Sequence, residues 1–583
     1  MMRNRTIQRR TRAAAERVAL PGVHPVLQGV YAARGVRCLA DLTDGLGALA
    51  GTDGLAGLSG AVERLARAIT SGQSILVVGD FDADGASSCA LAVLAMRAMG
   101  ARHVDYLVPN RFEFGYGLTP EIVGEAKRRQ PDLLVTVDNG VSSVDGVAMA
   151  RHLGMGVIVT DHHLPPEHLP DADALVNPNQ PGDAFPSKHL AGVGVIFYVL
   201  AALRQHLRAQ GWFAGRCEPR MADYLDLVAL GTVADVVPLD RNNRILVEQG
   251  LRRIRADRAR PGIRALLEIA GRDPGACVAA DLGFAAGPRL NAAGRLKDMA
   301  MGIECLLTDH AAEARRYAQR LDALNRERRE IEGRMEAEAV DGVAVLRRSL
   351  EAKDGLPSAI CVTDSGWHQG VVGIVAARLK ERFHRPVVAF APAGEGVLKG
   401  SGRSIDALHL RDALERVATA HPGLIRRFGG HAAAAGLSVD EQRFPAFREA
   451  FEAVVGEALA DTDLAGVCLT DGALRSADMT LDLAQAIRAA GPWGQGFPEP
   501  RFDGVFSVLG SRVVGDRHLK LRLRPEDGGP SVDAIAFRAV DAGWVHLRGW
   551  VRIAYRLEVN LWQGRASLQL VVEHLEAVSA TAG

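Results

Sequence analysis

The stretch SILVVGDFDADG, residues 74–85, decides the fold of the first half of the chain. Its opening run, SILVVG, is short, apolar and rich in β-branched residues, which is typical of a buried strand. Asp80, Asp82 and Asp84 follow this run directly, and residues 86–99 are apolar enough to form a helix that packs on a sheet. Parallel sheets are covered by helices on both faces, so a buried strand that leads at once into a helix predicts a parallel α/β sheet.

The same pattern occurs twice more along the chain. LLVTV (133–137) leads into Asp138 of a VDNG motif. VIVT (157–160) leads into three polar residues, Asp161, His162 and His163. Because ligands of such sheets bind beyond the carboxyl ends of the strands, we expect these acids and histidines to meet at one edge.

A fourth acid, Asp235, follows the apolar part of LGTVADVVPL, and we interpret it as another acid at a strand end. Carboxylates so close together repel one another unless cations neutralise them, and oxygen-rich sites suit Mg²⁺ or Mn²⁺. Two divalent cations about 3.5–4 Å apart share a bridging carboxylate and clamp a phosphate. Each acid taken singly has an alternative interpretation as a helix cap. An EF-hand calcium loop is excluded, because Leu91 stands where its glutamate is required.

Composition excludes several classes of protein. Lys+Arg and Asp+Glu number 69 each in 583 residues, so net charge gives no argument for nucleic-acid binding. The seven cysteines form no CxxC pair, which argues against a structural zinc site and favours the reducing cytoplasm. No apolar run is long enough for a membrane helix, so we expect no membrane partner. The first seventeen residues contain six Arg without an apolar region, and we expect a solvated, frayed terminus rather than a secretory signal.

The rest of the chain predicts an α/β multidomain protein. Residues 309–340 predict one long charged helix, either partly packed on its own domain or a bridge to a smaller α/β segment that starts near residue 357. After residue 502, runs of period two joined by a glycine turn predict a C-terminal antiparallel β-barrel. The expected parts are an N-terminal segment (1–70), the parallel-sheet domain (71–308), the connecting helix (309–340), the smaller α/β domain (341–460) and the barrel (461–583).

Several motifs together carry a family resemblance. GDFDADG, VDNG, DHH and GTVADVVPL resemble, in this order, the motifs of the DHH phosphoesterase superfamily. Within it, the chain is similar to the bacterial exonucleases that degrade single-stranded DNA 5′→3′. That likeness rests on PNRFEFGYGL (109–118), GPRLNAAGRL (287–296), SGWHQGVVGIVAARL (365–379), GSGRS (400–404), GGHAAAAG (429–436) and NLWQGRASLQL (560–570).

The resemblance implies roles for the acids and histidines. Asp82 and Asp138 would hold one cation, with Asp80 nearby. The second cation would be held by Asp84, Asp138, His162 and Asp235, so that Asp138 bridges the two. His163 would face the scissile phosphate, and Asp161 would orient a histidine.

The resemblance also implies contacts with DNA. The smaller α/β segment is similar to a DHHA1 substrate-binding domain, and the barrel to an oligonucleotide-binding (OB) fold. We interpret GSGRS as a glycine-flanked turn that grips phosphate, and GGHAAAAG as a loop that leads into a helix of small residues. The predicted DNA contacts are Arg111, Tyr116, Arg289, Asn291, Arg295, Ser401, Arg403, Ser404 and His431. On the barrel, Arg522, Arg524, Arg552 and Arg556 alternate with apolar residues near Trp550 and Trp562, although any solvated sheet face shows such alternation.

The implied function is hydrolysis of single-stranded DNA from the 5′ end with two Mn²⁺ or Mg²⁺ ions, in recombination and repair. The resemblance adds a monomer in the cytoplasm, with a single-strand-binding protein and a recombination helicase as partners. One alternative is a DHH phosphoesterase of short oligonucleotides or cyclic dinucleotides, although such enzymes are typically shorter and have no barrel. The other is a non-catalytic single-strand-binding scaffold, which would be expected to have lost metal ligands.

Overall fold

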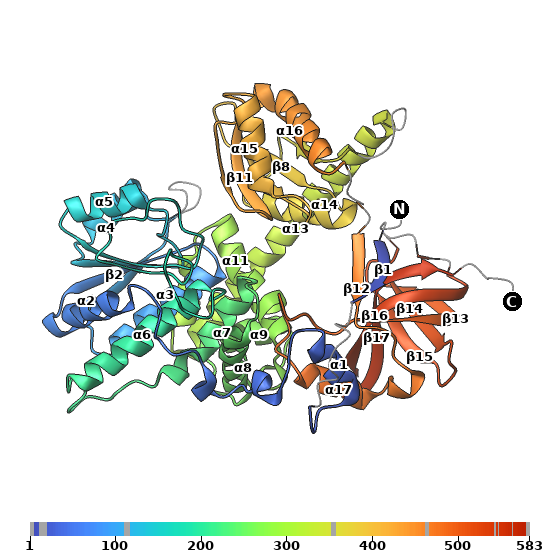
Figure 1. Ribbon diagram of the computed structural model, residues 1–583, viewed down its shortest axis with the longest axis horizontal. Coiled ribbons are helices and arrows are strands. Elements are labelled where there is room, and N and C mark those ends of the chain that lie inside the picture. The colour runs from blue at the N-terminus through green and yellow to red at the C-terminus, as the bar shows by residue number, and fades with distance from the viewer. Residues whose placement is uncertain are drawn as a thin grey trace. The chain divides into compact units, whose positions relative to one another are not determined.

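The computed structural model describes residues 5–10, 20–109, 117–350, 357–460, 464, 466–540, 544–545, 547–562 and 564–578, without the side chains of 344–350, 562 and 577. The chain forms two compact units (Figure 1). The larger unit comprises residues 11–325 and 485–500, and the smaller unit comprises 1–10, 326–484 and 501–583. The domain boundaries expected from the sequence stay predictions.

The larger unit contains the predicted parallel sheet. Its strand order is β3-β2-β4-β5-β6, and every pair is parallel. The bounds are β2 Ser74–Gly79, β3 His103–Leu107, β4 Leu133–Val137, β5 Gly156–Thr160 and β6 Ala174–Val176. The expected strands at 74–79, 133–137 and 157–160 are confirmed.

Helices cover both faces of this sheet, as Figure 1 shows. α4 (Pro120–Arg128) and α5 (Val144–His152) pack on one face, where Ile122 and Val147 join an apolar core with the strands. α2 (Leu58–Ser71), α3 (Ala83–Ala98) and α6 (Gly192–Ala209) lie on the other face. The remaining α-helices of four or more residues in this part are α1 Pro25–Ala32, α7 Leu225–Ala234, α8 Arg241–Arg255, α9 Pro261–Ile269, α11 Gly287–Leu296 and α12 Ala300–Leu307.

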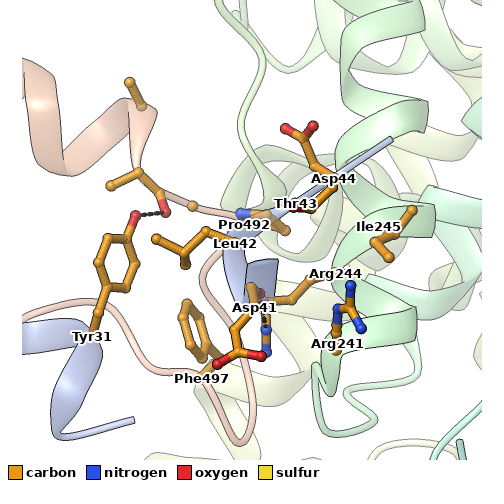
Figure 2. A pocket seen from close by; sticks show the side chains of 13 residues that line it. Tyr31, Asp41, Leu42, Thr43, Asp44, Arg241, Arg244, Ile245, Pro492 and Phe497 are labelled. Atoms are coloured by element: carbon orange, nitrogen blue, oxygen red, sulfur yellow. Dashed lines mark hydrogen bonds between the residues drawn. The ribbon is translucent and has the colours of Figure 1, made fainter. Parts of the chain in front are cut away.

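A segment from late in the sequence, 485–500, packs within the larger unit. The rings of Trp493 and Phe497 stack near Tyr31 of α1, with centroids 5.9 and 6.1 Å from the Tyr31 ring. The Tyr31 hydroxyl donates to the carbonyl of Ala490 at 2.8 Å. Figure 2 shows the pocket beside these contacts, where Arg244 lies over the Phe497 ring. The unit that carries the parallel sheet therefore includes residues beyond 460.

The smaller unit contains a second sheet, of order β10-β11-β9-β8-β7. Only β7 with β8 is parallel. α15 (Leu410–Ala420) and α16 (Phe444–Ala458) contribute to a core with the sheet, and α14 (Val372–Phe383) also packs on it. The bounds are β7 Ile360–Thr363, β8 Val387–Pro392, β9 Val397–Arg403, β10 Arg427–Gly430 and β11 Ala434–Asp440.

Two local predictions in this sheet are wrong. GSGRS is the end of β9 rather than a turn, because its glycines make room for neighbours: a Cβ on Gly402 would lie 2.7 Å from Leu410 Cδ2. GGHAAAAG does not enter a helix but forms the end of β10, a short turn and the start of β11. The two motifs are paired strands, with Gly436 opposite Ser401.

The C-terminal residues form a closed barrel of order β13-β14-β15-β17-β16, which confirms the predicted barrel. One of its pairs, β15 with β17, is parallel, so the expectation of a purely antiparallel barrel is corrected. The bounds are β13 Phe502–Val514, β14 His518–Pro525, β15 Val532–Ala536, β16 Gly549–Trp562 and β17 Arg565–Ala577.

The expectation of a frayed N-terminus is wrong for residues 5–9. They form β1 (Arg5–Arg9), which pairs in parallel with β12 (Gly466–Thr470). Ile7 is buried with Cys468 and Ala554, and Arg9 binds the buried carboxylate of Asp503 at 3.0 Å. The partners lie more than 450 residues away in sequence, so no local pattern predicts this strand.

The predicted connecting helix is α13, Ala311–Leu350, which extends past the expected end at residue 340. Its chain crosses from the larger unit into the smaller one at residue 325. Among the helices of the described residues, none combines the length and apolarity needed to cross a membrane.

Candidate metal centre and anion site

Strand register brings the predicted acids together. Gly79 lies opposite Val137, and Val137 lies opposite Thr160, so β2, β4 and β5 end in one row. The residues that follow these ends are Asp80, Asp138 and Asp161, all buried. Asp138 has a φ of 61°, a left-handed conformation that is uncommon outside glycine and is often found at functional sites.

The GDFDADG loop places two further carboxylates through the start of α3. Asp82 is the N-cap, and its Oδ1 accepts from the amides of Asp84 and Gly85 at 3.0 Å each. The helix-cap alternative therefore holds for Asp82 without excluding a metal role. Asp84 is buried and accepts from the amides of Gly192 and Val193 at the start of α6.

The side chains form overlapping groups whose possible ligand atoms lie within 4.8 Å of one another. Asp138 belongs to two of the groups, and so does His162. His162 Nε2 lies 3.1 Å from Asp138 Oδ1 and 3.5 Å from Asp235 Oδ2. The groups are Asp80–Asp82–Asp138, Asp84–His162–Asp235 and Asp138–His162–His163.

Burial and crowding set the electrostatics of this cluster. Burial, together with the charges of the neighbouring acids, raises the pKa values of Asp84 and Asp138 well above the ordinary range. The same causes raise the pKa of Asp235 to about 7, while burial lowers the pKa of His162 to about 4. Asp138 Oδ1 and His162 Nε2 are buried, and neither makes a hydrogen bond among the described residues. Crowded carboxylates and a neutral imidazole are suited to divalent cations.

His163 is oriented by Asp161. Its Nδ1 lies 2.7 Å from Asp161 Oδ1. Burial opposes a charge on His163, but the hydrogen bond to Asp161 and nearby acidic charges outweigh it and raise the pKa to about 9. Asp161 also accepts from the amides of Val141, His162 and His163.

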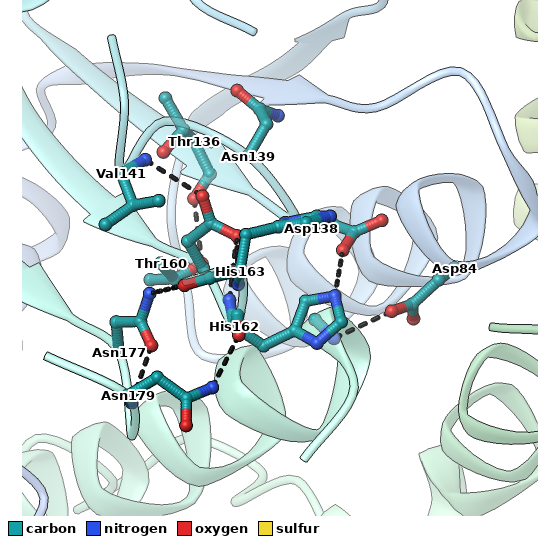
Figure 3. A network of polar contacts seen from close by, with 12 residues as sticks. Asp84, Thr136, Asp138, Asn139, Val141, Thr160, His162, His163, Asn177 and Asn179 are labelled. Carbon is teal, nitrogen blue, oxygen red and sulfur yellow. Dashed lines mark hydrogen bonds and ion pairs between the residues drawn. The ribbon is translucent and has the colours of Figure 1, made fainter. Parts of the chain in front are cut away.

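Two asparagines of the VNPNQPG segment were not predicted from the sequence. Asn179 donates to the carbonyl of His162 at 2.7 Å, and Asn177 donates to that of His163 at 2.8 Å (Figure 3). They hold the histidine backbone without touching the acids. The sequence signal available for these residues was the Asn-Pro-Asn stretch after a short strand. Such a stretch predicts a turn, but it does not predict that the asparagines bind the backbone of the two histidines.

The strand-end interpretation of Asp235 is wrong. The apolar stretch before it is helix α7, and Asp235 is the C-cap. Short apolar runs fit a buried helix as well as a buried strand, and α7 is buried along nearly its whole length. Asp235 nevertheless lies in the cluster with Asp84 and His162.

The predicted DNA contacts of the larger unit have mixed outcomes. Arg289 is buried, binds Asp322 at 2.8 Å and donates to the carbonyl of Ala285, so its observed contacts are internal. Asn291 accepts from the amide of Ala83. Arg295 is partly exposed near the end of α11. Arg111 and Tyr116 lie outside the described residues.

In the smaller unit, Ser401 and Arg403 project from the same face of β9. The Arg403 guanidinium donates to Ser401 Oγ at 3.0 Å. A Cβ on Gly373, near the start of α14, would lie 2.9 Å from that hydroxyl and 3.1 Å from Arg403 Nη2. A guanidinium, a hydroxyl and a helix N-terminus thus meet at one place, a combination that suits an anion.

The other two predicted residues of this unit differ from each other. Ser404 is buried, and its hydroxyl donates to the carbonyl of Leu408 at 2.9 Å. Its contact with DNA stays a prediction. His431 is exposed at the turn between β10 and β11.

The arginines predicted on the barrel divide between two strands. On β16, Arg552 binds Asp503 at 3.1 Å and Arg556 binds Glu573 at 2.7 Å, so acids within the barrel neutralise both. On β14, Arg522 and Arg524 are exposed. Trp550 is also exposed, and the side chain of Trp562 lies outside the described part of the chain.

Family models match three parts of the chain. The first is the N-terminal domain of the DHH family at residues 74–232, the second a DHHA1 domain at 356–457, and the third a RecJ OB domain at 470–574. Together with the acid and histidine cluster at the sheet edge, these define a DHH-family protein with DHHA1 and OB domains.

Similarity to known proteins is more specific. Over 575 residues the chain is 56% identical to the single-stranded-DNA-specific exonuclease RecJ of Dickeya dadantii, covering 98% of this chain and 99% of that protein. The crystal structure of RecJ with Mn²⁺ from Thermus thermophilus matches with 34% identity and a TM-score of 0.77, over 96% of this chain and 77% of that one. The Mg²⁺ complex from the same organism matches with 31% identity and a TM-score of 0.72, over 96% and 75%. The chain belongs to the RecJ family.

Proposed function

We propose that this protein is a single-stranded-DNA-specific exonuclease that hydrolyses phosphodiester bonds in the 5′→3′ direction. The observation that carries the proposal is the cluster at the ends of β2, β4 and β5, in which Asp138 and His162 each belong to two possible cation sites. An intact ligand set argues against a non-catalytic scaffold. The closed barrel argues against a phosphoesterase of short oligonucleotides.

The cluster would hold two divalent cations, Mn²⁺ or Mg²⁺. Asp80, Asp82 and Asp138 would hold one, and Asp84, Asp138, His162 and Asp235 the other. When bound, such a pair neutralises phosphate charge and activates water. Asp138 Oδ1 and His162 Nε2 fit this assignment. Both atoms are buried and accept or donate no hydrogen bond among the described residues, so each is available to bind a cation.

His163 would act on the phosphate. Its Nδ1 is held by Asp161, so proton transfer or donation to a phosphate oxygen would involve Nε2. In the metal-free protein, the hydrogen bond to Asp161 and the charges of nearby acids raise the pKa of His163 to about 9 despite its burial. A positive charge there would stabilise the negative charge that develops in the transition state.

DNA contacts would come from both units. Ser401, Arg403 and the start of α14 would bind a phosphate, with His431 and Arg295 as further contacts. Arg522, Arg524 and Trp550 would contact a longer strand on the outside of the barrel, where charge and stacking bind without sequence preference.

The biological setting is part of the proposal. The protein would act as a monomer in the cytoplasm during recombination and repair, with a single-strand-binding protein and a recombination helicase as partners. Family membership supports the repair role.

The test uses a single strand labelled at either end, with a blunt duplex as control. With Mn²⁺, we expect the 5′ label to leave at once as a mononucleotide, while the 3′-labelled strand shortens stepwise. The duplex should resist, and EDTA should stop the reaction. Early release of the 3′ label, or cleavage inside the strand, would contradict the proposal.

A further inference from the structure

The helix α11, which carries the GPRLNAAGRL motif, contacts the loop that supplies three of the clustered acids. The side-chain Oδ1 of Asn291 accepts from the backbone amide of Ala83 at 2.7 Å. A Cβ on Gly294 would lie 1.8 Å from the carbonyl oxygen of Phe81, so only glycine permits the observed approach. Both contacts fall between Asp80 and Asp84.

The same helix also reaches the other side of the cluster. A Cβ on Gly287, its first residue, would lie 3.1 Å from the Cβ of Ala234. Ala234 is the last residue of α7 and immediately precedes Asp235. One helix therefore packs against both the Asp80–Asp84 loop and the helix end that positions Asp235.

Hydrogen bonding at the start of α3 gives Asn291 a specific task. The first amides of a helix have no partner within it. Here Asn291 satisfies the first, that of Ala83, while Asp82 Oδ1 satisfies the next two. Without Asn291, the Ala83 amide would lose the acceptor that fixes the start of α3.

We propose that Asn291 is a positioning residue that holds the Asp80–Asp84 loop in the geometry needed to bind cations, and that it is not a DNA contact. It acts through the backbone of Ala83 and touches no reacting atom. An amide suits this task because it accepts a hydrogen bond without adding charge to a crowded acidic cluster. The inference rests on the proposed two-cation site.

The test measures Mn²⁺ binding to the full-length protein by calorimetry without DNA, and DNA binding separately in EDTA. Asn291→Ala should weaken Mn²⁺ binding about 10-fold or more, as loss of an outer contact to a metal site commonly does. Single-strand affinity in EDTA should change less than about 2-fold. Unchanged Mn²⁺ affinity, or a loss of DNA affinity in EDTA, would overturn the inference.

Asn242→Ala is the matched control. Asn242 Oδ1 accepts from the amide of Ala50 at 3.0 Å and from the Tyr198 hydroxyl at 2.9 Å, in the same unit and outside the acid cluster. Its loss removes a bond of the same type together with the bond from Tyr198, and it should leave Mn²⁺ affinity unchanged. A wild type that binds no Mn²⁺ would refute the proposed function itself.

If Asn291→Ala does not fold, Asn291→Asp tests the positioning role instead, because it keeps the side-chain oxygen that accepts from the Ala83 amide. It should bind Mn²⁺ at least as tightly as the wild type. Weaker Mn²⁺ binding by this variant would overturn the inference.

Discussion

Replacing Asp138 with Asn should stabilise the metal-free protein and abolish its response to Mn²⁺. Asn has nearly the same shape, which matters because Gly192 packs directly against the Asp138 side chain. The substitution removes the charge and replaces one carboxylate oxygen with an NH2 group. In the metal-free protein that charge is opposed by burial and by the neighbouring acids, which raise the pKa of Asp138 well above its ordinary value.

The magnitude follows from the geometry. Ligand atoms of Asp80, Asp82 and Asp138 lie within 4.8 Å, a separation at which two like charges repel by about 3.5 kcal/mol at an effective dielectric constant of about 20. Proton uptake limits the penalty, because neutralising a carboxyl of ordinary pKa at pH 7 costs about 4 kcal/mol. This cost of about 4 kcal/mol is the upper limit of the penalty. We expect Asp138→Asn to stabilise the metal-free protein by about half of it, ~2 kcal/mol, which corresponds to a rise in melting temperature of about 2–4 °C.

The assay is thermal unfolding in EDTA and then with increasing Mn²⁺. In EDTA, Asp138→Asn should melt above the wild type. With Mn²⁺ at about 100 times its dissociation constant, the wild type should gain about 2.7 kcal/mol, and the order should reverse. The turnover of the variant should fall more than about 100-fold, a loss above ~2.7 kcal/mol.

The control is Asp226→Asn in the same unit. Burial raises the pKa of Asp226 too, but each of its two carboxylate oxygens accepts from a backbone amide, one from Arg260 and the other from Leu227. An Asn side chain has only one oxygen and would leave one of these amides without its acceptor. Its neutralisation should not stabilise the protein and should leave the Mn²⁺ response intact. The reasoning is refuted if Asp138→Asn melts below the wild type in EDTA, or if Mn²⁺ stabilises that variant as much as the wild type.

Three further predictions concern the smaller unit. Arg403→Ala should raise KM for single-stranded DNA more than it lowers kcat. Arg403→Lys should restore KM only in part, because a point charge does not replace the planar guanidinium. Steady-state kinetics of Arg403→Ala that match the wild type would contradict the anion site. Gly373→Ala should also raise KM, because the added methyl group would crowd Ser401 and Arg403. Gly333→Ala is the control, since a Cβ there meets no neighbour within 4 Å, and its KM should match the wild type. Equal KM values for the two variants would refute a role for the start of α14. Asp503→Asn should destabilise the barrel near pH 7, because Arg9 and other partners lower the pKa of Asp503 despite its burial. The difference in melting temperature from the wild type should shrink as the pH falls from about 4 through the lowered pKa of the folded protein, because the carboxylate is protonated in both states only below that pKa. A difference that stays constant with pH would exclude an ionic cause.

The acids at the sheet edge were predictable because each follows a short apolar run. Parallel strands that end in one row must place Asp80, Asp138 and Asp161 side by side, and the observed register does so. Asp235 was expected at a strand end because it follows an apolar stretch; it caps α7 instead, and it nevertheless lies with Asp84 and His162. An apolar run of ten residues contains too little periodicity to separate a buried helix from a buried strand.

Other features depend on partners distant in sequence. The glycines of GSGRS indicate a turn when taken alone, and only the neighbouring Leu410 explains why Gly402 lies in a strand. The pairing of β1 with β12 cannot be derived from five residues rich in arginine. Likewise, nothing local indicates that residues 485–500 pack beside Tyr31.

The residues that hold the metal-binding loops are mostly uncharged, and this explains why a search for charged motifs does not find them. Asn139 donates to the carbonyls of Val78 and Val137, so it links the ends of two strands. Asn177, Asn179 and Asn291 hold three further backbone positions around the cluster. A lysine or arginine in their place would pair with a carboxylate and compete with the cations. An amide fixes the backbone and leaves the clustered carboxylates available, so these asparagines complement the backbone contacts of Asp82 and Asp161 and become visible only when the loops are folded.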